Sequence, residues 1–232
     1  DFDNGASMDV TPYHKFYVKT GYGSRKVVET RAGELKPGDM IDKFSLPVVD
    51  NEDAPDFPYA YTAGLHSADG TYGVNGSPIL RLYPGKTHLG EFIEYKSSSL
   101  KPDATGRVSY VLHQGTPRKY VVPDSTYSLK SRLEWLAGML DGDGWGNGKV
   151  GLQIGSIHPE FLEDIRIMLT EMGVSSRWKK MRDAGRTRFK PGQKEYETKT
   201  AYRLIISGTE SQTLRKLGLP TRRVIVEEVD HQ

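Results

Sequence analysis

The sequence predicts an α+β fold in which two similar halves pack around a central pair of helices. Two observations predict it. One short pattern occurs twice, at residues 62–70 (TAGLHSADG) and at residues 136–144 (LAGMLDGDG), 74 residues apart. After each copy, helix-like and strand-like periodicities follow one another in a similar order. A chain of 232 residues has room for one or two domains of this kind.

The two halves are expected to span residues 59–125 and 126–221, in the order αβ(β)αββ. The elements expected in the first half are a helix over 59–69, a strand over 79–83, a helix near 86–97, and strands over 107–113 and 118–122. Those expected in the second half are a helix over 128–142, a strand over 149–154, an amphipathic helix over 159–172, strands over 174–181 and 201–206, and a helix over 210–217. The loop at about 182–199 makes the second hairpin the longer one.

The ends of the chain have a different character. Residues 1–46 contain short β-prone segments separated by glycine turns, and residues 47–58 have the proline-rich, acidic composition of a linker. Within residues 222–232, the segment 223–229 (RVIVEEV) resembles the start of the returning strand of an intein splicing domain. We therefore expect a short β segment, a linker, the two-repeat domain over 59–221, and the start of a further strand.

The repeated pattern has features that point to a metal site. Its small residues recur at helical spacing, so two such helices can approach closely, and Gly64 and Gly138 need a packing reason because glycine weakens a helix by about 1 kcal/mol. Each copy ends on a carboxylate, Asp69 or Asp143, at the negative end of the helix dipole. Paired helices would bring these acids together, and a hard divalent cation such as Mg²⁺ (or Mn²⁺) would relieve their repulsion.

These two segments resemble the paired motifs of LAGLIDADG homing endonucleases, the second copy more closely than the first. The resemblance implies a pseudo-symmetric αββαββα core whose two antiparallel sheets form a saddle over duplex DNA. It also implies metal-dependent double-strand cleavage, with Asp69 and Asp143 as the metal ligands. Lys119 and Lys216 share a Lys-x-x-x-Pro spacing. By the resemblance, each would be a catalytic lysine beside the metals.

Residues 10–16 (VTPYHKF) and 33–39 (GELKPGD) resemble a motif of the Hint splicing domain of inteins. The resemblance implies partial all-β splicing-domain segments at both termini and a splicing role for Thr11 and His14. The chain begins at Asp1, contains no cysteine and ends at Gln232. We therefore expect that it does not splice alone, and that missing intein N- and C-terminal segments are possible partners.

The distribution of charged and apolar residues limits what the chain is expected to bind. Residues 177–203 hold ten Lys and Arg against three Asp and Glu, with interleaved aromatics, which suits a phosphate backbone or, equally, a solvated hairpin. The candidate DNA contacts are Arg81, Arg107, Arg118, Arg177, Lys179, Lys180, Arg182, Arg186, Arg188 and Arg203. The lack of an 18-residue apolar run excludes a membrane span. The absence of cysteine fits a reducing, cytoplasmic location, and we expect a monomer.

The function predicted from these features is an intein-encoded, site-specific endonuclease that hydrolyses both strands of a double-stranded DNA target. Two alternatives stay open at this point. One is a relative that keeps the fold and binds DNA or RNA without cutting it, and the other is a fragment of a splicing intein whose endonuclease is a relic.

Overall fold

The structure is a computed structural model that describes residues 1–2, 7–42, 46–99, 101–147, 149–187 and 195–228. The chain divides into two compact units, residues 1–46 and residues 47–232. No helix in the described ranges is long and apolar enough to cross a membrane. The division lies at the start of the predicted linker, so residues 47–58 belong to the larger unit.

The smaller unit is a single antiparallel hairpin. Strand β1 (Lys15–Lys19) pairs with β2 (Val27–Arg31), and the short 3-10 helix η1 (Ala32–Glu34) follows. None of its described residues is buried, so these residues form no hydrophobic core of their own. A two-stranded hairpin of this kind is at best marginally stable alone.

The larger unit is built from the two predicted repeats. The elements of the first repeat are α1 (Ala60–Asp69), β3 (Gly70–Tyr72), β4 (Pro78–Leu82), the 3-10 helix η2 (Thr87–Phe92), β5 (Ser97–Ser98) and β6 (Val108–Val111). Those of the second are α2 (Leu129–Asp143), β7 (Gly144–Asn147), β8 (Gly151–Ser156), α3 (Pro159–Glu171), β9 (Ser176–Arg182), β10 (Gly185–Thr187), β11 (Tyr196–Thr198), β12 (Ala201–Ile206) and α4 (Gly208–Lys216).

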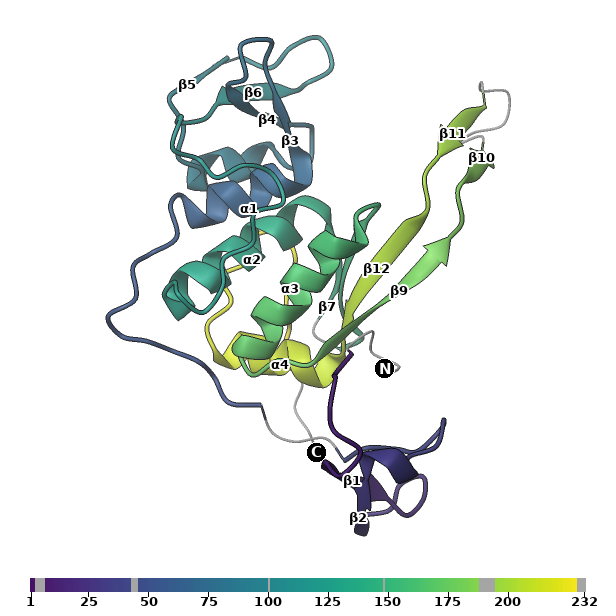
Figure 1. Ribbon diagram of the computed structural model, residues 1–232. Coiled ribbons are helices and arrows are strands. Elements are labelled where there is room, and N and C mark those ends of the chain that lie inside the picture. The colour runs from purple at the N-terminus through teal and green to yellow at the C-terminus, as the bar shows by residue number, and fades with distance from the viewer. Residues whose placement is uncertain (3–6, 43–45, 100, 148, 188–194, 229–232) are drawn as a thin grey trace. The chain divides into compact units, whose positions relative to one another are not determined.

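Each repeat forms an antiparallel four-stranded sheet with the same connectivity. The strand orders are β3-β4-β6-β5 and β7-β8-β12-β9, so in each sheet the strand that comes last in the chain lies between the second and the third. In Figure 1, α1 and α2 lie side by side between the two sheets, and the β10–β11 ribbon extends from strands β9 and β12. The α+β class and the two-repeat organisation are therefore as predicted.

Several local predictions were wrong. Residues 118–122 form turns rather than a strand, and the helix expected near 86–97 is only the short η2. The described residues 222–228 form bends and coil rather than a strand. Strands β2, β5, β10, β11, β3 and β7 were not predicted. The last two are short strands that follow the motif helices directly and contain or begin with glycine.

The predicted linker packs on the second repeat. Val49 N–H donates to Glu171 O at 2.7 Å, and the guanidinium of the fully buried Arg132 donates to Val49 O. Phe57 is buried in the core, and its backbone N–H donates to Ser131 Oγ at 3.0 Å. These contacts give the segment a fixed path along α2, which is why a linker composition was misleading.

Candidate active site

The close approach of α1 and α2 explains the glycine of each repeated motif. A Cβ added to Gly64 would lie 1.9 Å from Trp135 O, and one added to Gly138 would lie 2.0 Å from Tyr61 O. The two contacts are related by the 74-residue offset of the motifs, so the helix pair has pseudo-twofold symmetry. Only glycine allows the backbones to touch in this way.

The symmetric crossing brings the two motif acids to the same end of the helix pair. Asp69 is the last residue of α1 and Asp143 the last of α2. Burial raises the pKa of the Asp143 carboxyl, and the nearby charge of Asp69 raises it further. Lys86, Lys119 and Arg223 are close enough to oppose this rise. The predicted pairing of the two carboxylates is therefore present, surrounded by three cationic side chains.

Lys86 was not predicted from the sequence. Its Nζ donates to Asp69 Oδ2 at 2.6 Å, and both side chains are mostly shielded from solvent. The residue follows a Pro-Gly turn after β4, which indicates a loop but gives no sign that the loop folds back onto α1. Asp69 thus has a bound ammonium group, whereas Asp143 forms no salt bridge with a described residue.

Lys119 lies at the site as predicted. Its Nζ donates to Gly70 O at 2.7 Å, and burial lowers its pKa against the opposing effect of both acids. Its backbone is held on each side: Lys119 N–H donates to the Tyr72 hydroxyl at 2.9 Å, and Tyr120 N–H donates to Ser67 Oγ at 3.2 Å. Tyr120 has a φ of 70°, an uncommon left-handed conformation for a tyrosine. This non-ladder bonding explains why no strand forms at 118–122.

The second-repeat counterpart of Lys119 is Arg223, which the sequence analysis did not identify. Arg223 Nη2 donates to Gly144 O at 2.6 Å, and Gly144 lies 74 residues after the Gly70 that accepts from Lys119. Lys216, which was predicted for this role, is an exposed residue at the end of α4. The Lys-x-x-x-Pro spacing was misleading because the second repeat continues through a further helix before its chain returns to the motif.

The segment that carries Arg223 is bound tightly to α2. The carboxylate of fully buried Asp141 accepts the backbone N–H groups of Arg222, Arg223 and Val224 at 2.8 to 3.0 Å, and the Tyr61 hydroxyl at 2.9 Å. Arg223 also donates to Leu140 O at 2.9 Å and Gly142 O at 3.2 Å, which satisfies carbonyls at the helix end. We call residues 222–224 the C-terminal strap.

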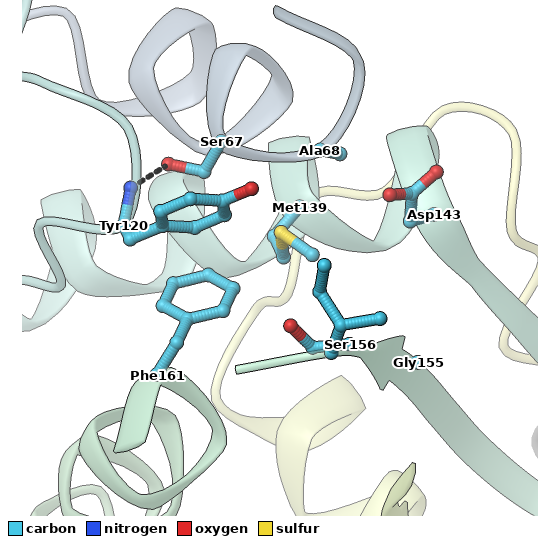
Figure 2. Close-up of a pocket in the computed structure, with 9 residues that line it drawn as sticks. Ser67, Ala68, Tyr120, Met139, Asp143, Gly155, Ser156 and Phe161 are labelled. Carbon is cyan, nitrogen blue, oxygen red and sulfur yellow. Dashed lines mark hydrogen bonds between the residues drawn. The ribbon is translucent and has the colours of Figure 1, made fainter. Parts of the chain in front are cut away.

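A pocket of about 160 Å³ opens beside Asp143. Figure 2 shows Asp143 at one side of it, Tyr120 and Phe161 at the other, and the hydrogen bond from Tyr120 N–H to Ser67 Oγ along its rim. Gly155 and Ser156, at the end of β8, line the remaining wall. The pocket therefore lies between the Asp143 end of the helix pair and the end of β8.

Comparison with known proteins gives a family match for the second repeat. Residues 130–217 match the model of the LAGLIDADG-like domain. The chain thus carries a LAGLIDADG-like domain that includes α2 and ends within its second repeat. It is 35% identical over 241 residues to the ribonucleoside-diphosphate reductase large subunit of Invertebrate iridescent virus 6. That match covers 97% of this chain, which spans about a quarter of the relative (25%).

Two solved structures show a loose likeness to this chain. One is I-DmoI in complex with DNA and Mn, with 12% identity, a TM-score of 0.42, and coverage of 71% of this chain and 97% of that one. The other is full-length DUF199/WhiA from Thermatoga maritima, with 14% identity, a TM-score of 0.42, and coverage of 72% of this chain and 58% of that one.

The two motif acids have the donor chemistry for a hard cation but form a small set. Among the described residues, no group of three or more His, Asp or Glu side chains could hold a metal ion. Asp69 and Asp143 supply carboxylate oxygens only, which suits Mg²⁺ or Mn²⁺ because such ions keep several waters and bind substrate phosphates. Burial, and to a lesser extent the charge of Asp69, raises the pKa of Asp143, and a bound cation would stabilise the charged carboxylate against both effects. The residues fit a cation whose remaining ligands come from water and substrate.

The basic residues predicted to contact DNA belong to the larger unit and differ in their exposure and in their partners. Arg81, Arg118, Arg177, Lys179 and Arg182 are exposed, and they form no ion pair within the described part of the chain. Three others are already paired: Arg107 with Asp103 at 2.7 Å, Lys180 with Asp183 at 2.6 Å, and Arg186 with Glu197 at 3.6 Å. Arg203 stacks on Trp145, and Arg188 lies outside the described residues.

The splicing-motif residues of the smaller unit lie in an exposed turn. His14 N–H donates to Thr11 O at 3.0 Å, and the His14 ring packs edge-on against Phe16 with centroids 5.0 Å apart. Both Thr11 and His14 are accessible to solvent. The geometry gives them a shared turn, and their splicing role stays a prediction.

Proposed function

We propose that this chain is a site-specific DNA endonuclease that hydrolyses both strands of a duplex. The observation that carries the proposal is the pseudo-twofold site: two acids at the ends of two crossed helices, with Lys119 and Arg223 on equivalent carbonyls. A twofold arrangement of acids matches the local twofold symmetry of the two strands of DNA. One acid would serve each strand.

The roles of the side chains follow from their positions. A divalent cation held at Asp69 and Asp143 would neutralise charge at the scissile phosphate and lower the pKa of an attacking water. Lys119 is cationic, half-buried and held beside both acids, so it would stabilise negative charge that develops on the phosphate. Arg223 would keep the end of α2, and with it Asp143, in place. Lys86 must leave Asp69, or share it, when a cation binds.

We also propose that the chain is an inserted element of a ribonucleotide reductase, as an intein carrying an endonuclease would be. The relative named as a reductase matches nearly all of this chain over only a quarter of its own length. Because this chain carries a LAGLIDADG-like domain, the matched quarter of the relative would be an insertion rather than part of the reductase fold. The solvent-exposed hairpin unit, with Thr11 and His14, would be the part of a splicing domain that lies before the endonuclease.

The test uses a supercoiled plasmid with the reductase coding sequence from which the segment encoding this chain has been removed. The protein should linearise it with Mg²⁺ or Mn²⁺, leave it intact with EDTA, and spare the same plasmid with the segment in place. Asp143→Asn should reduce the rate by at least about a hundredfold with DNA affinity kept, because an amide binds hard cations poorly. Asp53→Asn, an exposed acid of the same unit, is the matched control and should cut normally.

One observation favours a second candidate, a DNA-binding protein that does not cut. The Lys86 ammonium already lies on Asp69, where a cation would bind. In the same assay, this candidate predicts specific binding with no linear product at any Mg²⁺ or Mn²⁺ concentration. That outcome would refute the endonuclease proposal, and Lys86→Ala would then show whether the lysine alone blocks cleavage.

A further inference from the structure

The second sheet has one face against the core and one open face. On β12, Leu204 and Ile206 are buried in the core, whereas Arg203 points to the opposite side by strand alternation. Lys179 lies opposite Arg203 in the β9–β12 register and is exposed. Trp145, on β7, is 40% exposed. These residues share the open face that begins directly after Asp143.

Trp145 and Arg203 form a stacked pair across this face. The Arg203 Cζ lies 4.4 Å from the centroid of the Trp145 ring. The strand between them, β8, has Gly155 opposite Arg203, and a Cβ there would lie 3.9 Å from the Trp145 ring. The glycine leaves the space through which the arginine reaches the indole. Within the described part of the chain, Arg203 forms no hydrogen bond or ion pair, and its Nε is buried without a partner.

A guanidinium that is stacked on a ring and otherwise unpaired is preorganised to bind a planar hydrogen-bonding partner. The indole face fixes the plane of the guanidinium and shields one side of it, so little rotamer entropy is lost when its edge donates hydrogen bonds. Such a fork matches the O6 and N7 acceptors of guanine in the major groove, the commonest specific contact between a side chain and a base. A neighbouring lysine such as Lys179 has no fork and acts as a point charge on phosphate.

We propose that Arg203, oriented by Trp145, is a specificity residue that reads one guanine in the half-site bound by the second sheet. The inference rests on the proposed function, because it requires that the open face meets duplex DNA. Trp145 is the positioning residue, and Lys179 contributes affinity without sequence choice. The residue at the position of Trp145 in the first repeat is Thr71, 74 residues earlier, which offers no aromatic face. The guanine is therefore read in one half-site only.

The position of this guanine is limited by the sheet. Gly155, opposite Arg203, lines the same pocket as Asp143. Two strand spacings separate β7, which directly follows Asp143, from β12, and with the length of an arginine side chain the reach from Asp143 is about 17 Å. Duplex DNA rises about 3.4 Å per base pair. The guanine thus lies within about five base pairs of the phosphodiester bond cut at Asp143, rather than at the far end of the site.

The test measures binding in EDTA, so that nothing is cut. The full chain is incubated with a pool of randomised 30-base-pair duplexes, and the bound fraction is sequenced for the wild type, Arg203→Lys, Lys179→Ala, Trp145→Phe and Trp145→Leu. Arg203→Lys keeps the charge and removes the fork. It should lose the preference for guanine at one position by about 5- to 150-fold while other positions keep theirs, and the salt dependence should not change.

The control variants should behave differently. Lys179→Ala should keep every base preference and lower the slope of log affinity against log salt by up to about 0.9. Trp145→Leu should weaken the guanine preference without changing the salt slope, and Trp145→Phe should restore part of it because a smaller aromatic face remains. A melting curve for each variant confirms that the sheet is folded.

The outcomes separate this inference from the proposed function. If the wild type cuts the plasmid described above but Arg203→Lys keeps its guanine preference, only the reading role of Arg203 is refuted. Arg203→Ala is measured as a further variant: an even loss of affinity over all sequences, with a lower salt slope, would also refute the reading role and make Arg203 a phosphate contact. If the wild type binds duplex DNA without any sequence preference, both proposals fail.

Discussion

Gly138→Ala tests whether the glycine of the second motif is required by the helix crossing. The new Cβ would lie 2.0 Å from Tyr61 O and 2.8 Å from Leu65 N. Real Cβ contacts are essentially never under 3.0 Å, so the helices must separate by about 1 Å. Both opposing atoms are backbone, so no side chain can rotate away to relieve the contact.

Two effects of opposite sign decide the magnitude. Alanine is the better helix former by about 1 kcal/mol. Overpacking costs typically 1–3 kcal/mol, and a gap of 0.5–1 Å forfeits a quarter to a half of each affected van der Waals contact. With backbone on both sides we expect the upper end of that range, so a net loss of about 2 kcal/mol in the free energy of unfolding. For a unit of this size that is a fall in melting temperature of about 4–8 °C.

The measurement is urea unfolding followed by circular dichroism, with Gly185→Ala as the control because nothing lies within 4 Å of a Cβ there. The double variant Gly64→Ala/Gly138→Ala should lose less than the sum of the single losses, because helices already pushed apart accept the second methyl cheaply. A Gly138→Ala protein as stable as the wild type, or about 1 kcal/mol more stable, would show that the backbones do not touch.

Three further predictions concern the site. Asp143→Asn should make the metal-free protein more stable at pH 8. The raised pKa of Asp143 means that the native state favours the protonated acid, so the wild type loses stability as the pH rises and the acid ionises. The difference in urea midpoint between variant and wild type should vanish below about pH 4, and an equal gain at all pH values would refute the argument. Lys119→Ala should slow cleavage about a hundredfold with less than threefold loss of DNA affinity; proportional losses would make Lys119 a backbone contact. Arg223→Ala should lower the free energy of unfolding in urea by about 2–4 kcal/mol, and Lys216→Ala by less than about 0.5 kcal/mol. Only the first change removes charge-assisted hydrogen bonds to carbonyl groups at the end of α2. Equal losses would contradict the assignment of Arg223, rather than Lys216, as the counterpart of Lys119.

The parts predictable from the sequence were those set by local periodicity and by the repeat. The helix ending on Asp69 and the one ending on Asp143 are within one residue of their predicted bounds, and the strand over 201–206 matches in full. The pairing of the two acids followed from the 74-residue repeat, since two similar helices with small faces pack symmetrically. The two acids at the centre of the site could therefore be predicted from the sequence alone.

The parts that could not be predicted depend on contacts between distant residues. Lys86 reaches Asp69 through a turn whose direction no local pattern encodes. Arg223 is the counterpart of Lys119 because the two side chains donate to the equivalent carbonyls of Gly144 and Gly70. Its neighbours in sequence favour a strand and give no sign of this role. Similarly, the stack of Arg203 on Trp145 depends on a sheet register that only the fold reveals. Short-range spacing misassigned Lys216 for the same reason.

The C-terminal strap has a consequence for the order in which the site is completed during protein synthesis. Val224 donates to an acid that precedes it by 83 residues, so Asp141 waits about 4 to 17 s for that partner at a translation rate of roughly 5–20 residues per second. During this interval the carbonyl groups at the end of α2 lack their hydrogen bonds from Arg223, and the buried Asp141 carboxylate lacks its hydrogen bonds from residues 222–224. We expect the two acids to reach their working arrangement only after residues 222–224 have left the ribosome, so a nascent chain that ends before the C-terminal strap carries no assembled nuclease.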